Sequence, residues 1–284
     1  CHFMGIHAPG LTNPMATFQT IHHLLLSHGL AARAIRAAAA TRPEVGITLS
    51  LAPVHPAEDT EEDRNAARRF DGVFNRMFLD PVYKACYPDD VRQLLEIIMP
   101  KPEAGDMETI STPLDFLGVN YYTRHVMKHN PDIFPLQAEE VYPEGHEYSG
   151  MWEIYTPGMY ELLTRMKADY NPGRILITEN GVPVPDGKDF DGKVRDFRRI
   201  RYVRDNLTEI HRAIEDDVPV QGYFHWTLTD NFEWAYGCTM RFGLVHIDFA
   251  TLQRTMKESG RWFAQVIRDN GLDPGASGLP FFPR

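Results

Sequence analysis

Short apolar runs alternate with helix-like segments along almost the whole chain, and this alternation limits the folds that it can adopt. Four runs have the length and composition of buried strands, at residues 46–51, 114–122, 175–178 and 222–228. A segment with helical spacing of apolar residues follows each of them. Strands that alternate with helices form parallel sheets, because each helix returns the chain to the start of the next strand. The sequence therefore predicts an α/β fold.

Helix signals give expected bounds for the connecting segments. Thr60 and Asp63 have the spacing of a capping box, which predicts a helix from there to about residue 79. Thr156 and Pro157 are typical of an N-cap and a first helical position, and that helix should end near residue 170. Other helices are expected over residues 15–39, after Pro88, over 194–216 and over 254–270. Residues 128–150 are expected to form a long surface excursion.

The number of βα units predicts a specific architecture. Four strands, each followed by a helix, make half of an eight-stranded (βα)8 TIM barrel. A doubly wound sheet is the alternative, but none of the four strands is followed by the glycine-rich phosphate loop typical of that fold. No linker marks a second domain. We therefore expect residues 1–284 to form one domain, a half-barrel.

The charge of the chain argues against several kinds of partner. Its formal net charge is −10, which disfavours binding to nucleic acid or to an anionic membrane. No stretch has the length of a membrane span. The dense basic run is expected to be a solvated helix face, and it consists of Arg195, Arg198, Arg199, Arg201 and Arg204.

The cysteines and histidines give no sign of a cofactor. Cys1, Cys86 and Cys238 are scattered, which indicates neither a disulfide framework nor a zinc site and fits a reducing, cytoplasmic setting. The histidines lack the i, i+4 spacing by which two imidazoles on one helix bind one metal ion. We expect no metal and no other cofactor. The histidines interpreted as structural are His2, His7, His22, His23 and His28.

Polar side chains stand at the ends of two predicted strands. Glu179 directly follows the run 175–178, and Asn120 and Tyr122 end the run 114–122. Reactive groups of parallel α/β enzymes lie at these C-terminal strand ends. An amide and a phenol there can hydrogen-bond a carboxylate and keep it ionised. Taken singly, Glu179 also fits a solvated turn beside Asn-Gly, and Tyr122 fits an aromatic strand end packed under a loop.

The fourth strand brings further candidates. Trp226 lies within it, and Glu233 and Trp234 follow it. Indole rings pack against the apolar faces of sugars, and a carboxylate can accept hydrogen bonds from two sugar hydroxyls. The alternative is core packing by Trp226 and a solvated acidic loop. With Glu179, these residues predict a sugar-cleaving site, although that chemistry needs two carboxylates and we identify one.

Several motifs together resemble those of a known family. The segments at residues 115–122, 177–181, 230–234 and 241–248 resemble glycoside hydrolase family 1, the β-glucosidases and their relatives. The resemblance covers essentially the whole chain in order. It implies a (βα)8 barrel that cleaves β-linked glucosides, galactosides or fucosides with retention of configuration.

The resemblance also implies roles for individual residues. Glu179 matches the nucleophile, Tyr122 the tyrosine that hydrogen-bonds it, and Asn120 the asparagine of the same strand end. The residues that match the sugar-binding positions are Trp226 as the aromatic platform, Glu233 and Trp234 as contacts of the outer hydroxyls, and Phe242 as a lining aromatic.

One departure from the family pattern changes the expected activity. The acid/base glutamate of the family lies in an Asn-Glu-Pro motif at the end of the fourth barrel strand, and this sequence contains no Asn-Glu-Pro. The chain therefore resembles strands five to eight only. We expect a β-glucosidase-type polypeptide that is inactive alone on natural substrates and needs a second half-barrel, from a homodimer or from a missing N-terminal half. The alternative is a non-catalytic half-barrel assembly or sugar-binding module.

Overall fold

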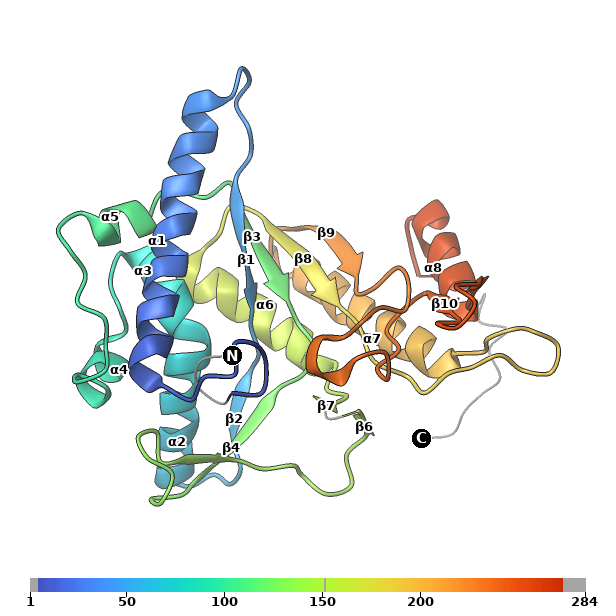
Figure 1. Ribbon diagram of the computed structural model, residues 1–284, viewed down its shortest axis with the longest axis horizontal. Helices are drawn as coiled ribbons and strands as arrows, with labels where there is room; N and C mark the ends of the chain where they lie inside the picture. The colour runs from blue at the N-terminus through green and yellow to red at the C-terminus, as the bar shows by residue number, and fades with distance from the viewer. Residues whose placement is uncertain (1–4, 151, 273–284) are drawn as a thin grey trace.

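A parallel sheet of four strands forms the centre of the computed structural model, which describes residues 5–150 and 152–272. The strands lie in the order β1-β3-β8-β9 and in chain order, as Figure 1 shows. Their bounds are Gly46–Ser50 (β1), Phe116–Asn120 (β3), Ile175–Asn180 (β8) and Val220–His225 (β9). All neighbouring pairs are parallel, which confirms the predicted α/β fold. The fourth strand lies slightly earlier in the chain than expected.

Helices precede, connect and follow the strands. They are α1 (Pro14–Ala38), α2 (Glu61–Asp71), α3 (Met77–Lys84), α4 (Asp89–Leu94), α5 (Asp106–Ile110), α6 (Pro157–Tyr170), α7 (Phe197–Glu215) and α8 (Glu258–Asp269). Within the described residues, no helix is both long and apolar enough to cross a membrane. Thr60 caps α2 as predicted, because its hydroxyl accepts from the amide of Asp63 at 3.2 Å. The Thr156 side chain makes no such bond at α6.

Two segments differ from their predicted structure. The helix expected to end near residue 79 continues through a π-helical turn, η1 (Gly72–Arg76), to the end of α3. The last helix begins later than expected, because Arg254–Met256 forms strand β11 and pairs antiparallel with β10 (Val245–Ile247). Residues with helix-compatible spacing thus form a strand where a neighbouring strand satisfies their backbone groups.

The predicted surface excursion contains ordered strands. β4 (His125–His129) pairs in parallel with β2 (Val54–Pro56) and antiparallel with β5 (Ala138–Glu140). A short hairpin of β6 (Tyr148–Ser149) and β7 (Trp152–Glu153) follows. In Figure 1, β2 and β4 lie beyond the C-terminal ends of β1 and β3. This additional layer forms one side of the region into which the central strands point.

The central sheet buries one face and leaves the other partly open. Successive side chains of a strand point to opposite faces, and on one face they pack under α6 and α7. This core includes Leu117, Val119, Ile175, Ile177, Met159, Leu162 and Ile210. Each such side chain contributes about 1.5–3 kcal/mol by its burial. On the opposite face Thr48 and Ser50 are exposed, and 58% of Phe224 is accessible to solvent.

Candidate functional site

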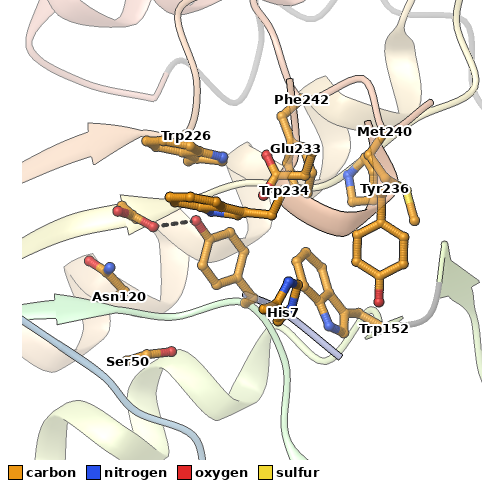
Figure 2. Close-up of a pocket in the computed structure, with 13 residues that line it drawn as sticks. His7, Ser50, Asn120, Trp152, Trp226, Glu233, Trp234, Tyr236, Met240 and Phe242 are labelled. Atoms are coloured by element: carbon orange, nitrogen blue, oxygen red, sulfur yellow. Dashed lines mark hydrogen bonds between the residues drawn. The ribbon is translucent and has the colours of Figure 1, made fainter. Parts of the chain in front are cut away.

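A cavity of about 360 Å³ opens at the C-terminal ends of the central strands. Figure 2 shows the side chains of its walls, which come from the strand ends and from the loop after β9. The structure brings all seven predicted site residues to this cavity, namely Asn120, Tyr122, Glu179, Trp226, Glu233, Trp234 and Phe242. The other lining residues are His7, Ser50, Trp152, Pro183, Tyr236 and Met240.

An irregularity in β8 directs Glu179 into the cavity. Ile177 pairs with Val119 of β3, but the next pair joins Glu179 to Asn120, so that Thr178 is an extra residue in β8. The register with β9 shifts over the same stretch. A bulge of this kind reorients the following side chains. Strict alternation would place Glu179 on the buried face with Ile177, whereas the bulge places Asn180 there instead.

Tyr122 donates a hydrogen bond to Glu179. The distance from its hydroxyl oxygen to Oε2 is 2.5 Å. Burial, together with the hydrogen bond and negative charge of Glu179, raises the pKa of Tyr122 well above its usual value. The phenol therefore remains protonated and acts as a donor at neutral pH. This bond fixes the position of one carboxylate oxygen of Glu179.

Asn120 lies next to this pair on the same side of the sheet. Its Oδ1 accepts a hydrogen bond from the hydroxyl of Thr178 at 2.7 Å. Because the amide oxygen is engaged by the neighbouring strand, the orientation of the Asn120 side chain is fixed. Its amide nitrogen is thereby left as the group that can donate to a ligand in the cavity.

The residues after Glu179 anchor the end of β8 behind the cavity. The side-chain nitrogen of Asn180 donates to the carbonyl of Tyr121 at 2.8 Å and to the hydroxyl of Tyr202 at 3.0 Å. Its oxygen accepts from the hydroxyl of Tyr223 at 2.9 Å. At Gly181, a Cβ atom would lie 1.9 Å from the carbonyl oxygen of Trp226. Glycine is therefore needed for the close approach that brings Trp226 beside β8.

The loop after β9 presents a second carboxylate. Asn231 donates from Nδ2 to Oε2 of Glu233 at 3.1 Å. The backbone of Glu233 closes a tight turn, because its amide donates to the carbonyl of Gly237 at 2.6 Å. Trp234 follows with 72% of its surface accessible to solvent, and Figure 2 shows it among the side chains that line the cavity.

A buried group of charged side chains holds this loop, and we call it the ion cluster: Arg199, Asp186, Asp196, Asp230, Arg241 and Lys257. The Lys257 ammonium donates to Asp186 at 2.7 Å and to Asp230 at 2.9 Å. Burial opposes ionisation of Asp230, but the hydrogen bond and charge of Lys257 outweigh it and lower the pKa of Asp230. Three cations and three carboxylates balance in charge, which makes their common burial possible.

The ion cluster corrects one sequence prediction. Arg199 was expected on a solvated face together with the other arginines of α7, but it is fully buried. It donates to Asp186 at 2.9 Å and to the carbonyl of Arg241 at 2.6 Å. Helical spacing alone did not separate Arg199 from its exposed neighbours, because its burial depends on contacts with Asp186 and with the backbone of Arg241, which lie outside α7.

His225 lies beside Trp226 and near the ion cluster. Burial and the positive charge of Arg199 lower the pKa of His225 to about 3. The imidazole is therefore uncharged at neutral pH. A neutral ring at this position adds no further positive charge to the three cations of the ion cluster.

Six lining residues were not identified from the sequence, and His7 and Trp152 are two of them. His7 was interpreted as structural, but it lines the cavity. Trp152 packs against Tyr122 with ring centroids 5.0 Å apart and against Phe242 at 5.7 Å. It comes from β7, next to the segment expected to be a surface excursion. An isolated tryptophan near a long polar stretch gave no signal of its position in the site.

The charges of the cavity favour a neutral ligand. Its described lining residues include two carboxylates, Glu179 and Glu233, and neither lysine nor arginine. Across the described part of the chain, no group of three histidine, cysteine, aspartate or glutamate side chains could hold a metal ion. Indole rings, an amide, a phenol and carboxylates together match the alternating apolar faces and hydroxyl groups of a sugar.

Parallel α/β sheets with such a set of groups at the strand ends are typical of enzymes that act on sugars. The family model described as Glycosyl hydrolase family 1 matches residues 1–272, and the chain belongs to this family. The resemblance of the motifs is thus confirmed.

Individual relatives agree with this assignment. The chain is 40% identical over 273 residues to 1,4-beta-D-glucan glucohydrolase of Thermotoga neapolitana, with 95% of this chain covered. It is 39% identical to Beta-glucosidase A of Acetivibrio thermocellus over 276 residues, again with 95% covered. A solved Beta-glucosidase from Thermotoga maritima in complex with deoxynojirimycin superposes with a TM-score of 0.91 at 37% identity and covers 96% of this chain. The chain spans 61% of the length of each of these three proteins.

Proposed function

We propose that this chain carries the nucleophile and the sugar-binding pocket of a retaining β-glucosidase-type hydrolase. The observation that carries the proposal is the 2.5 Å hydrogen bond from Tyr122 to Glu179 inside a cavity lined by indole rings. In the proposed complex with substrate, Trp226 lies under the sugar ring. Glu233 and Trp234 contact its outer hydroxyls, and Phe242 closes the pocket from the side.

The chemistry assigns one role to each group. The Glu179 carboxylate attacks the anomeric carbon, the bond from that carbon to the leaving oxygen breaks, and a glycosyl ester forms. Tyr122 holds the free oxygen of Glu179 in position, and Asn120 donates to a sugar hydroxyl. Because the cavity has two carboxylates and no lysine or arginine among its described lining residues, a neutral glucoside fits it better than a phosphorylated one.

The leaving group requires a proton that this chain does not supply. In retaining enzymes the proton donor is a second carboxyl group about 5–5.5 Å from the nucleophile. The sequence contains no Asn-Glu-Pro, and Glu233 is held by Asn231 for contacts with the sugar. The proposed natural activity therefore needs an acid/base residue from another polypeptide segment.

The dependence on the leaving group tests this division of roles. For the purified chain, we expect dinitrophenyl β-glucoside to glycosylate Glu179, whereas cellobiose stays intact. General acid catalysis contributes about 10²–10⁴-fold, and dinitrophenolate leaves without it. Azide, which needs no deprotonation, should accelerate turnover and yield a β-glycosyl azide. The rates and products can be followed by absorbance and chromatography. Cleavage of cellobiose at a comparable rate would place the proton donor within this chain.

The finer architecture that we propose is a half-barrel completed by a second half. β1 and β9 are the edges of the central sheet, and Phe224 is exposed on its open face. On the long helix α1, the apolar side chains of Met15, Leu24 and Leu30 are also exposed. Unpaired edges and exposed apolar side chains favour association with another chain. In a homodimer, each β1 would pair with the β9 of the partner and close an eight-stranded barrel.

The mass in solution tests the proposed assembly. At micromolar concentration, light scattering should give a dimer, or a complex when an N-terminal half is supplied, because closure would bury well over about 2,000 Å². Circular dichroism on the same sample checks that the protein is folded. A compact, folded monomer in the absence of a second half would contradict the proposal.

A non-catalytic sugar-binding module is the second candidate. It is favoured by the absence of Asn-Glu-Pro, because a pocket without its proton donor can still bind sugars. The two functions differ in one measurement, since covalent labelling of Glu179 occurs only if the carboxylate is placed to attack.

A further inference from the structure

The residue that holds the nucleophile lies beyond the regular part of its strand. β3 ends at Asn120, and the amide of the next residue, Tyr121, donates to the carbonyl of Glu179 at 2.9 Å. Tyr122 follows this last contact with β8. A tyrosine side chain has two rotatable bonds and a rigid ring, so that the position of its hydroxyl follows closely from that of its main chain. The place of the Glu179 carboxylate therefore depends on what holds the Tyr122 backbone.

A hydroxyl group from α7 holds this backbone. The Tyr202 hydroxyl donates to the carbonyl of Tyr122 at 3.1 Å and accepts from the side-chain nitrogen of Asn180 at 3.0 Å. Burial raises the pKa of Tyr202, so that the phenol stays neutral and can serve as donor and acceptor together. Because Asn180 directly follows Glu179, one hydroxyl joins the two segments that carry the nucleophile and its hydrogen-bond donor.

α7 is a rigid support for the Tyr202 side chain. Arg199 lies three residues before Tyr202 and therefore on the same face of the helix. It is fully buried and donates to Asp186 at 2.9 Å and to the carbonyl of Arg241 at 2.6 Å. Further along α7, Ile210 packs in the core under the sheet. The helix is thus held on both sides of Tyr202, and a group on a fixed helix is placed more precisely than one on a loop.

We propose that Tyr202 is a positioning residue for the reaction of Glu179, because it sets the place of the Tyr122 hydroxyl that holds the carboxylate. The inference rests on the proposed function, since it takes Glu179 as the nucleophile. Tyr202 is 2% exposed and is not among the residues that line the cavity. It therefore acts through the backbone of Tyr122 and not by contact with the sugar. Loss of its hydroxyl should slow the attack by Glu179 and leave sugar binding unchanged.

The rate at which a 2-fluoro dinitrophenyl β-glucoside labels Glu179 tests this inference. Labelling of the purified chain over a range of reagent concentrations separates the dissociation constant of the reagent from the maximal rate constant of attack. We expect Tyr202→Phe to lower the maximal rate constant about tenfold, because a misplacement of about 1 Å can cost about 10²-fold. The dissociation constant should not change. Partial unfolding would act differently, since it lowers the fraction of protein that is labelled and not the rate constant of the folded molecules.

A double substitution shows whether Tyr202 acts through Tyr122. Tyr122→Phe removes the hydroxyl that donates to Glu179. In that background, Tyr202→Phe should not lower the maximal rate constant any further, because the hydroxyl whose position it controls is gone. Two residues that act as one unit show this kind of non-additivity.

Tyr170→Phe is the matched control for loss of a buried hydroxyl. Tyr170 is also buried, its hydroxyl donates to Asp80 at 2.7 Å, and it does not line the cavity. The maximal rate constant of this variant should equal that of the unaltered protein. Circular dichroism of each variant confirms that it is folded before the rate constants are compared.

The possible outcomes separate the two proposals. An unchanged rate constant for Tyr202→Phe, an equal loss in Tyr170→Phe, or a loss that persists in the Tyr122→Phe background would overturn the positioning role while Glu179 remains the nucleophile. Absence of label on the folded, unaltered protein would remove the proposed function, and this inference with it.

Discussion

Glu179→Gln is expected to abolish covalent labelling by a 2-fluoro dinitrophenyl β-glucoside. The amide is a far weaker nucleophile than the carboxylate whose oxygen accepts from Tyr122 at 2.5 Å. The rate of dinitrophenolate release should fall more than about 10³-fold. Intact-mass spectrometry measures the label directly as the added mass of the glycosyl group.

Glu215→Gln provides the matched control for this experiment. Glu215 is exposed at the end of α7, where it lies 3.8 Å from His211 and does not line the cavity. This variant should label like the unaltered protein. Equal labelling of Glu179→Gln, or no label on folded, unaltered protein, would show that Glu179 does not act as a nucleophile in this chain. The sugar-binding module would then be the better description.

Lys257→Met is expected to destabilise the protein by about 3–5 kcal/mol, the typical cost of removing one partner from a buried ion pair. In the intact protein, Asp186 and Asp230 both lie within 2.9 Å of the Lys257 ammonium. The methionine leaves these two carboxylates buried without that cation. Asp230 also accepts a hydrogen bond from the amide of Gly243 at 3.0 Å. Because Asp230 would lack the neutralising charge of Lys257, the loop that carries Glu233 should become less firmly held. Urea unfolding monitored by circular dichroism measures the free energy of unfolding.

Lys188→Met separates the effect of burial from that of the substitution itself. Lys188 is exposed and donates to Gln253 at 2.7 Å, so that its replacement should change stability by less than about 0.5 kcal/mol. If both variants lost the same small amount, the ion cluster would not stabilise the fold. If the free energy of unfolding fell strongly for Lys257→Met alone, the buried charges would be the source of that stability.

The order of the elements could be predicted from the sequence because local patterns determine it. Short apolar runs identified all four central strands, and the Thr60 cap identified the start of α2. The strand ends then indicated Asn120, Tyr122 and Glu179, since parallel strands present their C-terminal ends at one edge. The fourth strand and the residues after it indicated Trp226, Glu233 and Trp234, and the resemblance to a family added Phe242. The structure places all of these residues at one cavity.

Other features depend on contacts between segments that are distant in the chain. Alternation along β8 would direct Glu179 to the buried face, and only the register with β3 and β9 reveals the bulge that reverses this. Arg199 looked like its exposed neighbours because its contacts with Asp186 and with the carbonyl of Arg241 come from outside α7. Residues 254–256 form a strand because β10 lies beside them. Local spacing contains no information about such partners.

The environment of Asn180 also affects the rate at which the protein deamidates during storage. Asn-Gly pairs deamidate when the nitrogen of the glycine attacks the asparagine amide, which requires the amide to rotate freely. Here the Asn180 amide is fully buried and makes hydrogen bonds to Tyr121, Tyr202 and Tyr223. Gly181 is confined by the carbonyl of Trp226. The pair beside Glu179 is therefore chemically durable while the sheet is folded, and an added negative charge at Asn180 in stored protein would record earlier unfolding.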